Sequence, residues 1–253
     1  MRRIRLIVSY DGTNYCGWQI QENAVTVEGT LTDALRKWLK EDIEIIGASR
    51  TDSGVHAYGN IAVFDTNSRI PSEKFAIGLN HYLPEDIRVQ KSDEVESDYH
   101  PRYRNTEKTY EYTILNTKIN LPTYSRYSYH VYHPLDFEAM KEAAELLVGE
   151  HDFSAFCSAG SQVKSKVRTI YEVSLDKQKV MGCNGGDLIR IRVRGNGFLY
   201  NMVRIISGTL VEVGLGKIKP EEIKTIIESK DRQKAGKTLP AHGLYFMNVN
   251  YKD

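Results

Sequence analysis

The chain has 253 residues, of which 41% are hydrophobic and 26% charged. This composition is typical of a folded globular protein and excludes a disordered one, and the length suits one large domain or two ordinary ones. No stretch is apolar enough to cross a bilayer, and the start, Met1-Arg2-Arg3-Ile4-Arg5, lacks the apolar core of a signal peptide. We therefore expect a cytoplasmic protein that does not insert into a membrane.

The cysteines and the charges narrow the class further. Cys16, Cys157 and Cys183 are far apart and form no C-x-x-C pair, so neither a disulfide framework nor a cysteine-ligated zinc site is expected. The net charge is only +1, but residues 1–97 carry 11 basic and 15 acidic side chains, whereas residues 98–253 carry 23 and 18. This asymmetry fits one basic face on a neutral protein, and it fits ordinary variation of a solvated surface equally well.

In chain order, the first half predicts the elements β-α-β-β-α-β. Apolar and polar residues alternate strictly over residues 4–10, which indicates a half-buried strand. Helical spacing follows over residues 27–39, then two short strands over 43–46 and 61–64. A second helix is predicted from Pro71 to the stop at Pro84, and a last strand over 87–89.

The second half repeats this order in outline. The pattern predicts a strand over 109–115, a helix over 134–148 closed by Gly149, a hairpin of strands 167–175 and 188–194 around Cys183-Asn184-Gly185-Gly186, and a buried helix over 198–213. We therefore predict an α+β fold of two lobes with related β-α-β-β-α-β order, whose antiparallel sheets form a central cleft. The predicted lobes are residues 1–103 and residues 104–253.

One segment between two predicted strands contains mainly small and polar residues, Gly47-Ala48-Ser49-Arg50-Thr51-Asp52-Ser53-Gly54-Val55-His56-Ala57. Small residues let another chain approach closely, and Arg50 together with backbone N–H groups would keep the Asp52 carboxylate ionised. The ordinary alternative is a loop aspartate that caps its own backbone, and the local sequence alone favours that alternative.

Arg204 lies in a predicted helix that is apolar on nearly every side. A buried arginine needs a carboxylate, and Asp52 is one candidate partner. A structural ion pair with another acid, or a side chain that reaches solvent, explains the sequence equally well.

Aromatic residues gather at the start of the second half, where eight of the 16 tyrosines fall between Tyr99 and Tyr132. Tyr110 and Tyr112 share one face of a predicted strand, and packing is the usual reason for tyrosine in a strand. These rings are, however, interleaved with Arg102, Arg104, Lys108 and Arg126. Such a mixture favours stacking on unpaired RNA bases.

Further basic residues follow in the second half. Arg190, Arg192 and Arg194 alternate with apolar residues and so share one face of a predicted strand. That row suits RNA phosphates, as do Lys164, Lys166 and Arg168 in the preceding loop. A solvated edge strand protected by its charges is the competing explanation.

The histidines do not indicate a metal site. His130 and His133 have no third ligand at a recognisable spacing, so no metal site is predicted.

The segment from Arg50 to Ala57 closely resembles the active-site signature of the TruA family of tRNA pseudouridine synthases. Further blocks match that family in order: Tyr10-Asp11-Gly12-Thr13-Asn14-Tyr15-Cys16-Gly17-Trp18-Gln19, Thr26-Val27-Glu28, Lys108-Thr109-Tyr110-Glu111-Tyr112, His151-Asp152-Phe153, Phe198-Leu199-Tyr200-Asn201-Met202-Val203-Arg204 and Ala241-His242-Gly243-Leu244. The resemblance covers nearly the whole chain. It departs at Ser49, where the family usually has glycine, and at Pro101, where alanine is more usual.

The resemblance implies a pseudouridine synthase fold and the isomerisation of uridines in the anticodon stem-loop of tRNA. It implies Asp52 as the catalytic aspartate, Tyr110 as the ring stacked on the target base, and Arg50 and Arg204 as the basic residues that organise the site. It also implies a homodimer that uses neither a metal nor an organic cofactor. An aspartate could act as nucleophile or as base on the ribose, and the sequence does not choose between them.

Two other classes of function compete with this one. A non-catalytic RNA-binding protein would bind tRNA without modifying it, and the intact set of Arg50, Asp52, Tyr110 and Arg204 argues against that class. An aspartate-dependent hydrolase of small molecules would need a second acid at a catalytic spacing, which the sequence lacks, and would leave the basic strand unexplained.

Overall fold

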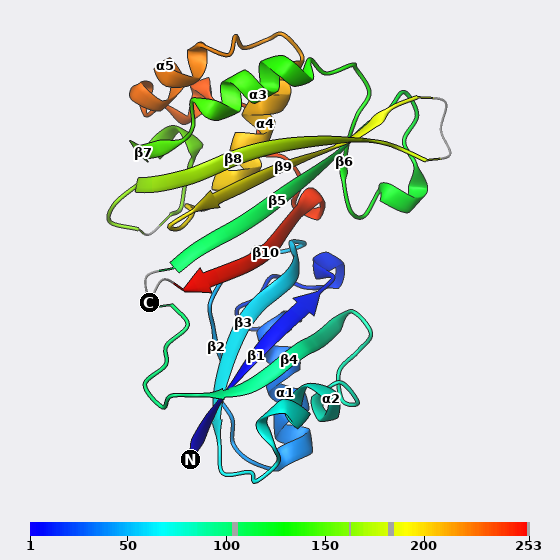
Figure 1. Cartoon of the computed structure of the whole chain (residues 1–253), viewed down its shortest axis with the longest axis vertical. Helices are drawn as coiled ribbons and strands as arrows, with labels where there is room; N and C mark the ends of the chain where they lie inside the picture. Colours follow the sequence, from blue (N-terminus) through cyan, green and yellow to red (C-terminus); the bar gives the residue numbers. More distant parts are fainter. Residues whose placement is uncertain (103–105, 162, 182–184, 252–253) are drawn as a thin grey trace. The chain divides into compact units, whose positions relative to one another are not determined.

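A computed structural model describes residues 1–102, 106–161, 163–181 and 185–251. The chain divides into two compact units, one formed by Met1–Thr106 with Tyr245–Asp253 and the other by Glu107–Leu244 (Figure 1). The prediction grouped residues 245–253 with the second half, whereas in the structure they pack with the first unit. Each unit combines a sheet with helices, which agrees with the predicted α+β class.

The first unit is built on the strand β1 (Arg2–Tyr10), which pairs antiparallel with both β3 (His56–Thr66) and β4 (Ile87–Val95). The short β2 (Ile46–Gly47) pairs with β3 on one stretch, and β10 (Leu244–Tyr251) runs parallel to β3 where Tyr245 is opposite His56. The element order β1-α1-β2-β3-α2-β4 is the predicted one. The strand predicted over 43–46 was mostly wrong, because only Ile46 of it belongs to β2.

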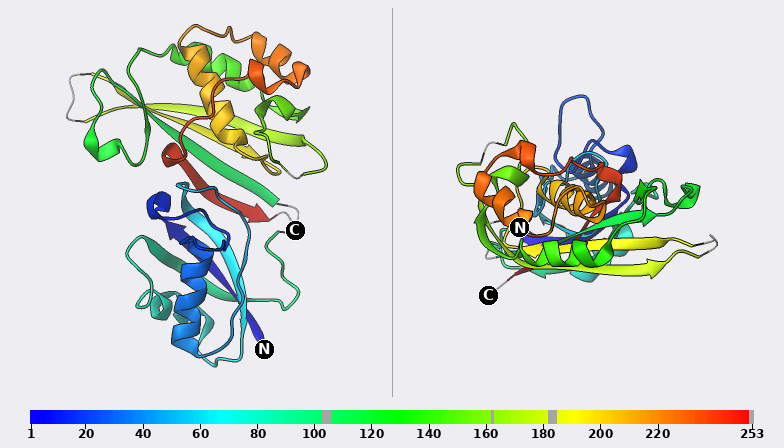
Figure 2. Two further views of the ribbon diagram at one scale, coloured as in Figure 1. Left: turned by 180° about the vertical axis from the view of Figure 1, so that it is seen from behind. Right: turned by 90° about the horizontal axis from the view of Figure 1, so that it is seen from above.

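Alternation in β1 explains how this unit is packed. Ile4, Leu6 and Val8 are fully buried, while Arg3 and Arg5 on the other face bond to carboxylates of the neighbouring strands. Arg3 is opposite Asp65 of β3 and Arg5 is opposite Asp93 of β4. The helices α1 (Val27–Leu39) and α2 (Phe75–Leu79) lie against the strands (Figure 2). Phe75 packs edge-on against both Trp38 of α1 and Phe64 of β3, so these rings join the helices to the sheet.

The second unit has the strand order β5-β9-β8-β7, with each neighbouring pair antiparallel. These strands are β5 (Thr106–Asn116), β7 (Gly149–Asp152), β8 (Val167–Lys179) and β9 (Asp187–Gly195). A short strand, β6 (Tyr129–Val131), pairs parallel with β5. The β8–β9 hairpin confirms the predicted pairing, although Cys183 and Asn184 of its predicted turn lie outside the described residues. The parallel pairs β3–β10 and β5–β6 correct the expectation of purely antiparallel sheets.

Three α-helices, α3 (Phe137–Glu145), α4 (Met202–Gly214) and α5 (Glu222–Ser229), complete the described part of the second unit. The helix α4 is buried over most of its length, as its apolar sequence predicts. It begins at Met202 and not at residue 198, because Asn201 has a left-handed backbone with a φ of 61°. Within the described residues, no helix is long and apolar enough to span a membrane.

Candidate active site

The segment between β2 and β3 carries Asp52 in a tight turn of the first unit. The Val55 N–H donates to the Asp52 carbonyl at 3.2 Å. Gly54 has a φ of 77°, a left-handed conformation that glycine adopts without strain. Asp52 is half-buried and Ser53 is exposed, so the turn presents the carboxylate at the surface without fully solvating it.

A buried polar network fixes the chain on both sides of Arg50. The Asn60 side chain accepts from the Ser49 N–H at 3.2 Å and donates to the Ser49 carbonyl at 3.0 Å, as the backbone of a neighbouring strand would. The Tyr10 hydroxyl lies 2.7 Å from Thr51 Oγ1 and accepts from the Asn60 amide at 3.4 Å. Both Asn60 and Tyr10 are buried. The backbone leading to Asp52 is therefore held by the sheet beneath it.

A second segment, residues 12–18, packs directly against the Asp52 turn. A Cβ on Gly12 would collide with the Val55 carbonyl, and one on Gly17 would lie 2.6 Å from the Thr51 carbonyl oxygen. The Trp18 N–H donates to that same Thr51 oxygen at 3.0 Å, and the Gly54 N–H donates to the Tyr15 carbonyl at 3.2 Å. Absent side chains at Gly12 and Gly17 let the two backbones approach closely.

The start of α1 supports residues 12–18 in turn. The Val27 and Glu28 N–H groups, which have no partner within the helix, donate to the Gly17 and Trp18 carbonyls at 3.2 and 2.9 Å. The buried Glu28 carboxylate accepts from Trp18 Nε1 at 3.3 Å and from the Ile20 N–H at 3.1 Å. The sequence blocks from Tyr10 to Gln19 and from Thr26 to Glu28 therefore form successive supports around the Asp52 turn.

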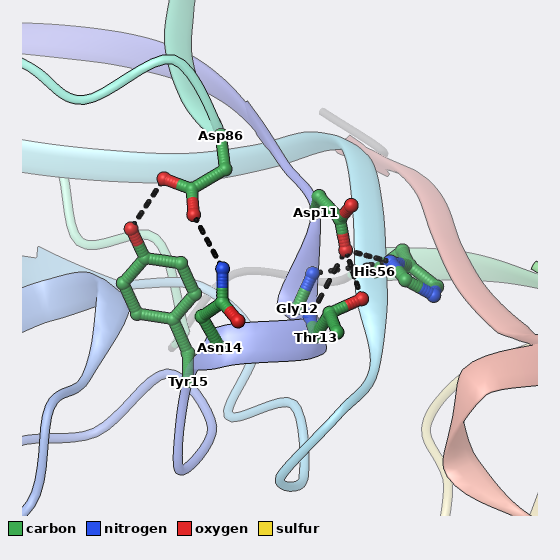
Figure 3. A network of polar contacts seen from close by, with 7 residues as sticks. All are labelled: Asp11, Gly12, Thr13, Asn14, Tyr15, His56 and Asp86. Atoms are coloured by element: carbon green, nitrogen blue, oxygen red, sulfur yellow. Dashed lines mark hydrogen bonds and ion pairs between the residues drawn. The ribbon is translucent and has the colours of Figure 1, made fainter. Parts of the chain in front are cut away.

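Figure 3 shows a further polar network at the start of this support. His56 Nδ1 lies 3.0 Å from Asp11 Oδ1 and 3.1 Å from the Gly12 nitrogen. The Asp11 contact needs a proton on Nδ1 and the Gly12 contact needs a lone pair there, so the two contacts belong to different protonation forms of the ring. His56 is 2% exposed and stacks on Tyr245 with the ring centroids 4.9 Å apart. His56 thus joins the start of β3 to Asp11 and to β10.

Tyr15 anchors the other side of the same network. Its hydroxyl donates to Asp86 Oδ1 at 2.6 Å, and the Asn14 amide donates to Asp86 Oδ2 at 3.2 Å. Burial and the bond to Asp86 raise the pKa of Tyr15 well above its usual value, so the phenol stays protonated and continues to donate. We assign these residues to support of the turn.

Of the other residues that the sequence singled out in the first unit, Arg50 is exposed to solvent. Its backbone is fixed by the bonds to Ser49 and Thr51 on either side, whereas its guanidinium is accessible to an incoming molecule. An anchored backbone with an accessible charged end suits contact with a substrate phosphate or ribose.

Tyr110 lies on β5 of the second unit, where its half-buried ring meets Phe198. The two ring centroids are 5.2 Å apart and the planes are at 83°, so the rings meet edge to face. Tyr112, two residues further along the same strand, is fully buried and its hydroxyl donates to the Pro240 carbonyl at 2.7 Å. The two tyrosines therefore have different surroundings, and of the two only Tyr110 keeps part of its ring accessible.

Arg204 is half-buried on α4, where the sequence predicts a charge within an apolar helix. Within the second unit, its Nε donates to the Leu239 carbonyl at 2.7 Å and its Nη1 to Asn201 Oδ1 at 2.6 Å. Asn201 also donates to Ser158 Oγ at 3.0 Å. These bonds hold the guanidinium in one orientation at the start of α4.

The arginines of β9 are not a free row of positive charge. Arg192 binds Glu111 at 2.6 Å, Arg194 binds Glu107 at 2.9 Å and Glu172 at 3.2 Å, and Arg190 binds Asp176 at 3.1 Å. Tyr110 is opposite Val193, and side chains alternate along a strand, so Arg192 and Arg194 point to the other face of the sheet from Tyr110. A phosphate that bound this row would therefore have to displace carboxylates. The competing explanation, a charged edge strand, is wrong, since β9 lies between β5 and β8.

Lys164 and Lys166 lie in the loop before β8, and both are exposed. They remain candidates for contact with a polyanion. Within the described residues, no group of three His, Cys, Asp or Glu side chains is placed to bind a metal ion.

Some supporting residues were not singled out by sequence reasoning, among them Asn60 and Asp86. Asn60 binds Ser49 from 11 residues away, and Asp86 binds Tyr15 from 71 residues away, so no local pattern marks them. The glycines in the block from Tyr10 to Gln19 did carry a signal, because two glycines in a short loop indicate close approach of another backbone.

Comparisons with known proteins agree with this arrangement of the sequence blocks. A family model described as tRNA pseudouridine synthase matches residues 6–104 and 143–252. Proteins called tRNA pseudouridine synthase A from Thermoanaerobacter sp. (strain X514) and from Acetivibrio thermocellus are each 50% identical over 251 residues, which is 99% of this chain and 100% of each relative.

A comparison of structures found the archaeal box H/ACA sRNP Nop10-Cbf5 complex, at 9% identity and a TM-score of 0.33. The match covers 96% of this chain and 46% of that one, and a likeness this weak carries no argument about the fold. The sequence matches extend over most of the chain and include Asp52, Arg50 and Arg204. The chain belongs to the tRNA pseudouridine synthase family.

Proposed function

We propose that this protein converts uridine to pseudouridine at positions 38–40 in the anticodon stem-loop of tRNA, the activity EC 5.4.99.12. The observation that carries this proposal is the family match over nearly the whole chain, with the Asp52 turn intact. The accessible Arg50 and the exposed Lys164 and Lys166 support a polyanionic substrate.

The reaction detaches uracil from the ribose at N1, turns the base, and rejoins it through C5. This is an isomerisation that consumes neither a redox equivalent nor a nucleotide. Asp52 would act either as nucleophile or as base on the sugar, and it must be ionised in both cases. We propose that Arg50 and Arg204 stabilise negative charge during this reaction, since both carry permanently charged guanidinium groups.

Tyr110 is proposed to stack on the target base after it leaves the RNA helix. Removing a base from its stack costs a few kcal/mol, which an aromatic ring can partly offset. The contact with Phe198 fixes the orientation of the Tyr110 ring before the substrate arrives.

We expect Tyr110→Phe to bind tRNA as the wild type does but to turn over more slowly, because the ring remains and the hydroxyl is lost. Equal turnover of Tyr110→Phe and wild type would leave Tyr110 a stacking role alone.

The proposed function is tested by mapping pseudouridine in total tRNA from cells with and without this gene. Loss of pseudouridine at positions 38–40, restored by the wild-type gene, is expected. An unchanged map would contradict the proposal. Restoration by a gene that encodes Asp33→Asn serves as a control, because Asp33 is an exposed aspartate on α1, away from the turn.

We further propose that the protein acts as a homodimer in the cytoplasm, where its tRNA substrate is found. Light scattering after size-exclusion chromatography should give twice the chain mass of 28.9 kDa. A mass equal to one chain, at the concentration at which the enzyme is active, would contradict the dimer without affecting the proposed reaction.

A further inference from the structure

Arg168, at the start of β8, differs from the arginines of the neighbouring strand β9. It is half-buried, and its Nη1 donates to the carbonyls of Ser165 at 3.0 Å and Val167 at 2.6 Å. Arg190, Arg192 and Arg194 each bind at least one carboxylate. Among the residues that the structure describes, no carboxylate lies within 4.0 Å of Arg168. Its Nε and Nη2 donate no hydrogen bond to any of these described residues.

A half-buried guanidinium without a carboxylate is unfavourable in the free protein. Removing part of the water from a charged group costs free energy unless an opposite charge replaces it. Burial accordingly lowers the pKa of Arg168 below its usual value, although a guanidinium stays charged near neutral pH. An anion that bound the open side of Arg168 would supply the missing charge.

The surroundings of Arg168 connect it to Tyr110. The position of a Cβ on Gly197 would be 3.8 Å from Arg168 Nε, so the missing side chain leaves the guanidinium uncovered there. The next residue, Phe198, is the ring that packs against Tyr110. Asn196 binds the strand at the other end of this short segment, because its Oδ1 accepts from the Thr169 N–H at 3.0 Å. Arg168, Gly197, Phe198 and Tyr110 thus form one contiguous group within the second unit.

We propose that Arg168 binds a backbone phosphate of the RNA, next to the nucleotide whose base Tyr110 holds. This inference rests on the proposed function, and it assigns a specific phosphate contact to the second unit. A guanidinium donates two parallel hydrogen bonds to a phosphate, and Nε and Nη2 form such a pair of donors on one edge of Arg168. Lys164 and Lys166, exposed in the same loop, add positive charge.

The proposed contact accounts for the contrast between Arg168 and the β9 arginines. Glu107, Glu111 and Glu172 already neutralise that row, so a phosphate there would have to displace a carboxylate. At Arg168 no described carboxylate has to be displaced. Of the arginines that the sequence predicts as phosphate contacts on β8 and β9, Arg168 is the one that binds no carboxylate of the described residues.

The test measures binding of an anticodon stem-loop RNA to the Asp52→Asn protein, which separates binding from turnover. Adding Arg168→Gln should weaken binding about tenfold or more. It should also make the slope of log affinity against log salt shallower by roughly 0.7 to 0.9, the value for one phosphate contact. Arg168→Lys should recover part of the affinity, because the charge returns without the paired donors. Lys224→Gln, which removes an exposed charge on α5, is the matched control and should change neither quantity.

A second arm identifies the phosphate. A series of stem-loops carries one neutral methylphosphonate each, at successive positions around the target uridine. At one position the methylphosphonate should weaken binding to the Asp52→Asn protein. The same stem-loop should bind the Asp52→Asn, Arg168→Gln protein as tightly as the unmodified stem-loop does. Equal binding and equal salt slopes with and without Arg168→Gln, in proteins of equal thermal stability, would overturn the proposal. If the wild type modifies tRNA in that case, only the Arg168 contact fails; if the wild type modifies no uridine, the proposed function fails instead.

Discussion

At the scale of single residues, the position of Asp52 depends on side chains that are absent. Gly12 and Gly17 allow residues 12–18 to lie against the turn, and the Trp18 and Tyr15 backbone groups then bond to it directly. A loop aspartate on its own would sample many orientations, whereas chemistry on a ribose needs the carboxylate in a narrow range of positions. These backbone contacts supply that constraint.

Replacing Gly17 by alanine should therefore disturb the Asp52 turn. The new Cβ would lie 2.6 Å from the Thr51 carbonyl oxygen, and the φ of 90° is unfavourable for alanine. We expect a loss of unfolding free energy of about 2 kcal/mol or more, and a fall in turnover that exceeds the fall in folded fraction. Urea unfolding and single-turnover assays measure the two effects.

Gly216→Ala is the matched control for Gly17→Ala. Gly216 also has a positive φ, of 71°, but nothing lies within 4 Å of its added Cβ. Gly216→Ala should lower the unfolding free energy by roughly 1 kcal/mol, because only the backbone conformation becomes unfavourable. The folded Gly216→Ala protein should turn over tRNA as the wild type does. If both variants turned over tRNA equally well, contact between residues 12–18 and the turn would not matter for catalysis.

Residue-scale prediction from sequence succeeded where the cause was local and failed where it was not. The small residues around Asp52 and the apolar setting of Arg204 can be seen in the sequence itself. The ion pairs of Arg192 and Arg194 cannot be seen there, because their partners Glu111, Glu107 and Glu172 come from strands on both sides of β9. Charge pairing across a sheet depends on strand register, which a single strand does not reveal.

At the scale of elements, β5 shows how one strand can serve two purposes. Tyr110 and Tyr112 share a face, yet Tyr112 is sealed by the segment that contains Gly243, whose added Cβ would lie 2.7 Å from the tyrosine ring. The Tyr110 ring meets Phe198 edge to face and stays half-buried. The buried tyrosine fixes the strand, and the accessible one is left for a ligand.

Tyr112→Phe should accordingly affect stability and not chemistry. It removes the hydrogen bond to the part-buried Pro240 carbonyl, which should lower the unfolding free energy by about 1 kcal/mol. Turnover of the folded protein should equal that of the wild type. Tyr132→Phe, at an exposed ring, should change neither quantity. A Tyr112→Phe protein of normal stability and reduced turnover would assign the hydroxyl to the reaction instead.

Element boundaries were predictable from periodicity but not to the residue. The alternation in β1 and the helical spacing of α1 gave these elements correctly. The start of α4 was placed too early, because Leu199 continues the apolar pattern while Asn201 takes a left-handed backbone that the pattern does not encode. The strand β10 was missed, since its pairing with β3 joins positions about 190 residues apart.

At the scale of the whole molecule, the last strand of the chain belongs with the first unit. Tyr245 and Phe246 pair in parallel with His56 and Ala57, directly after the Asp52 turn, and the Tyr251 hydroxyl donates to the Pro101 carbonyl at 3.2 Å. The order of elements along the chain predicts two consecutive lobes, and it does not reveal this long-range pairing.

Removal of residues 245–253 should therefore loosen the first unit. The deletion takes away the backbone partners of His56 and Ala57 and the ring that stacks on His56. Hydrogen exchange should show faster exchange at the amides that begin β3, while those of α3 in the second unit keep their protection. Unchanged protection at the start of β3 would contradict the assignment of the C-terminal strand to this unit.

We propose that Asp52 carries out the isomerisation of a uridine in tRNA. Tritium release from tRNA that contains 5-tritiated uridine tests this role, because the C5 hydrogen is lost when the base is rejoined through C5. Asp52→Asn should fold and bind tRNA as the wild type does, while tritium release falls by roughly 100-fold or more. Release at the wild-type rate from Asp52→Asn would contradict the claim.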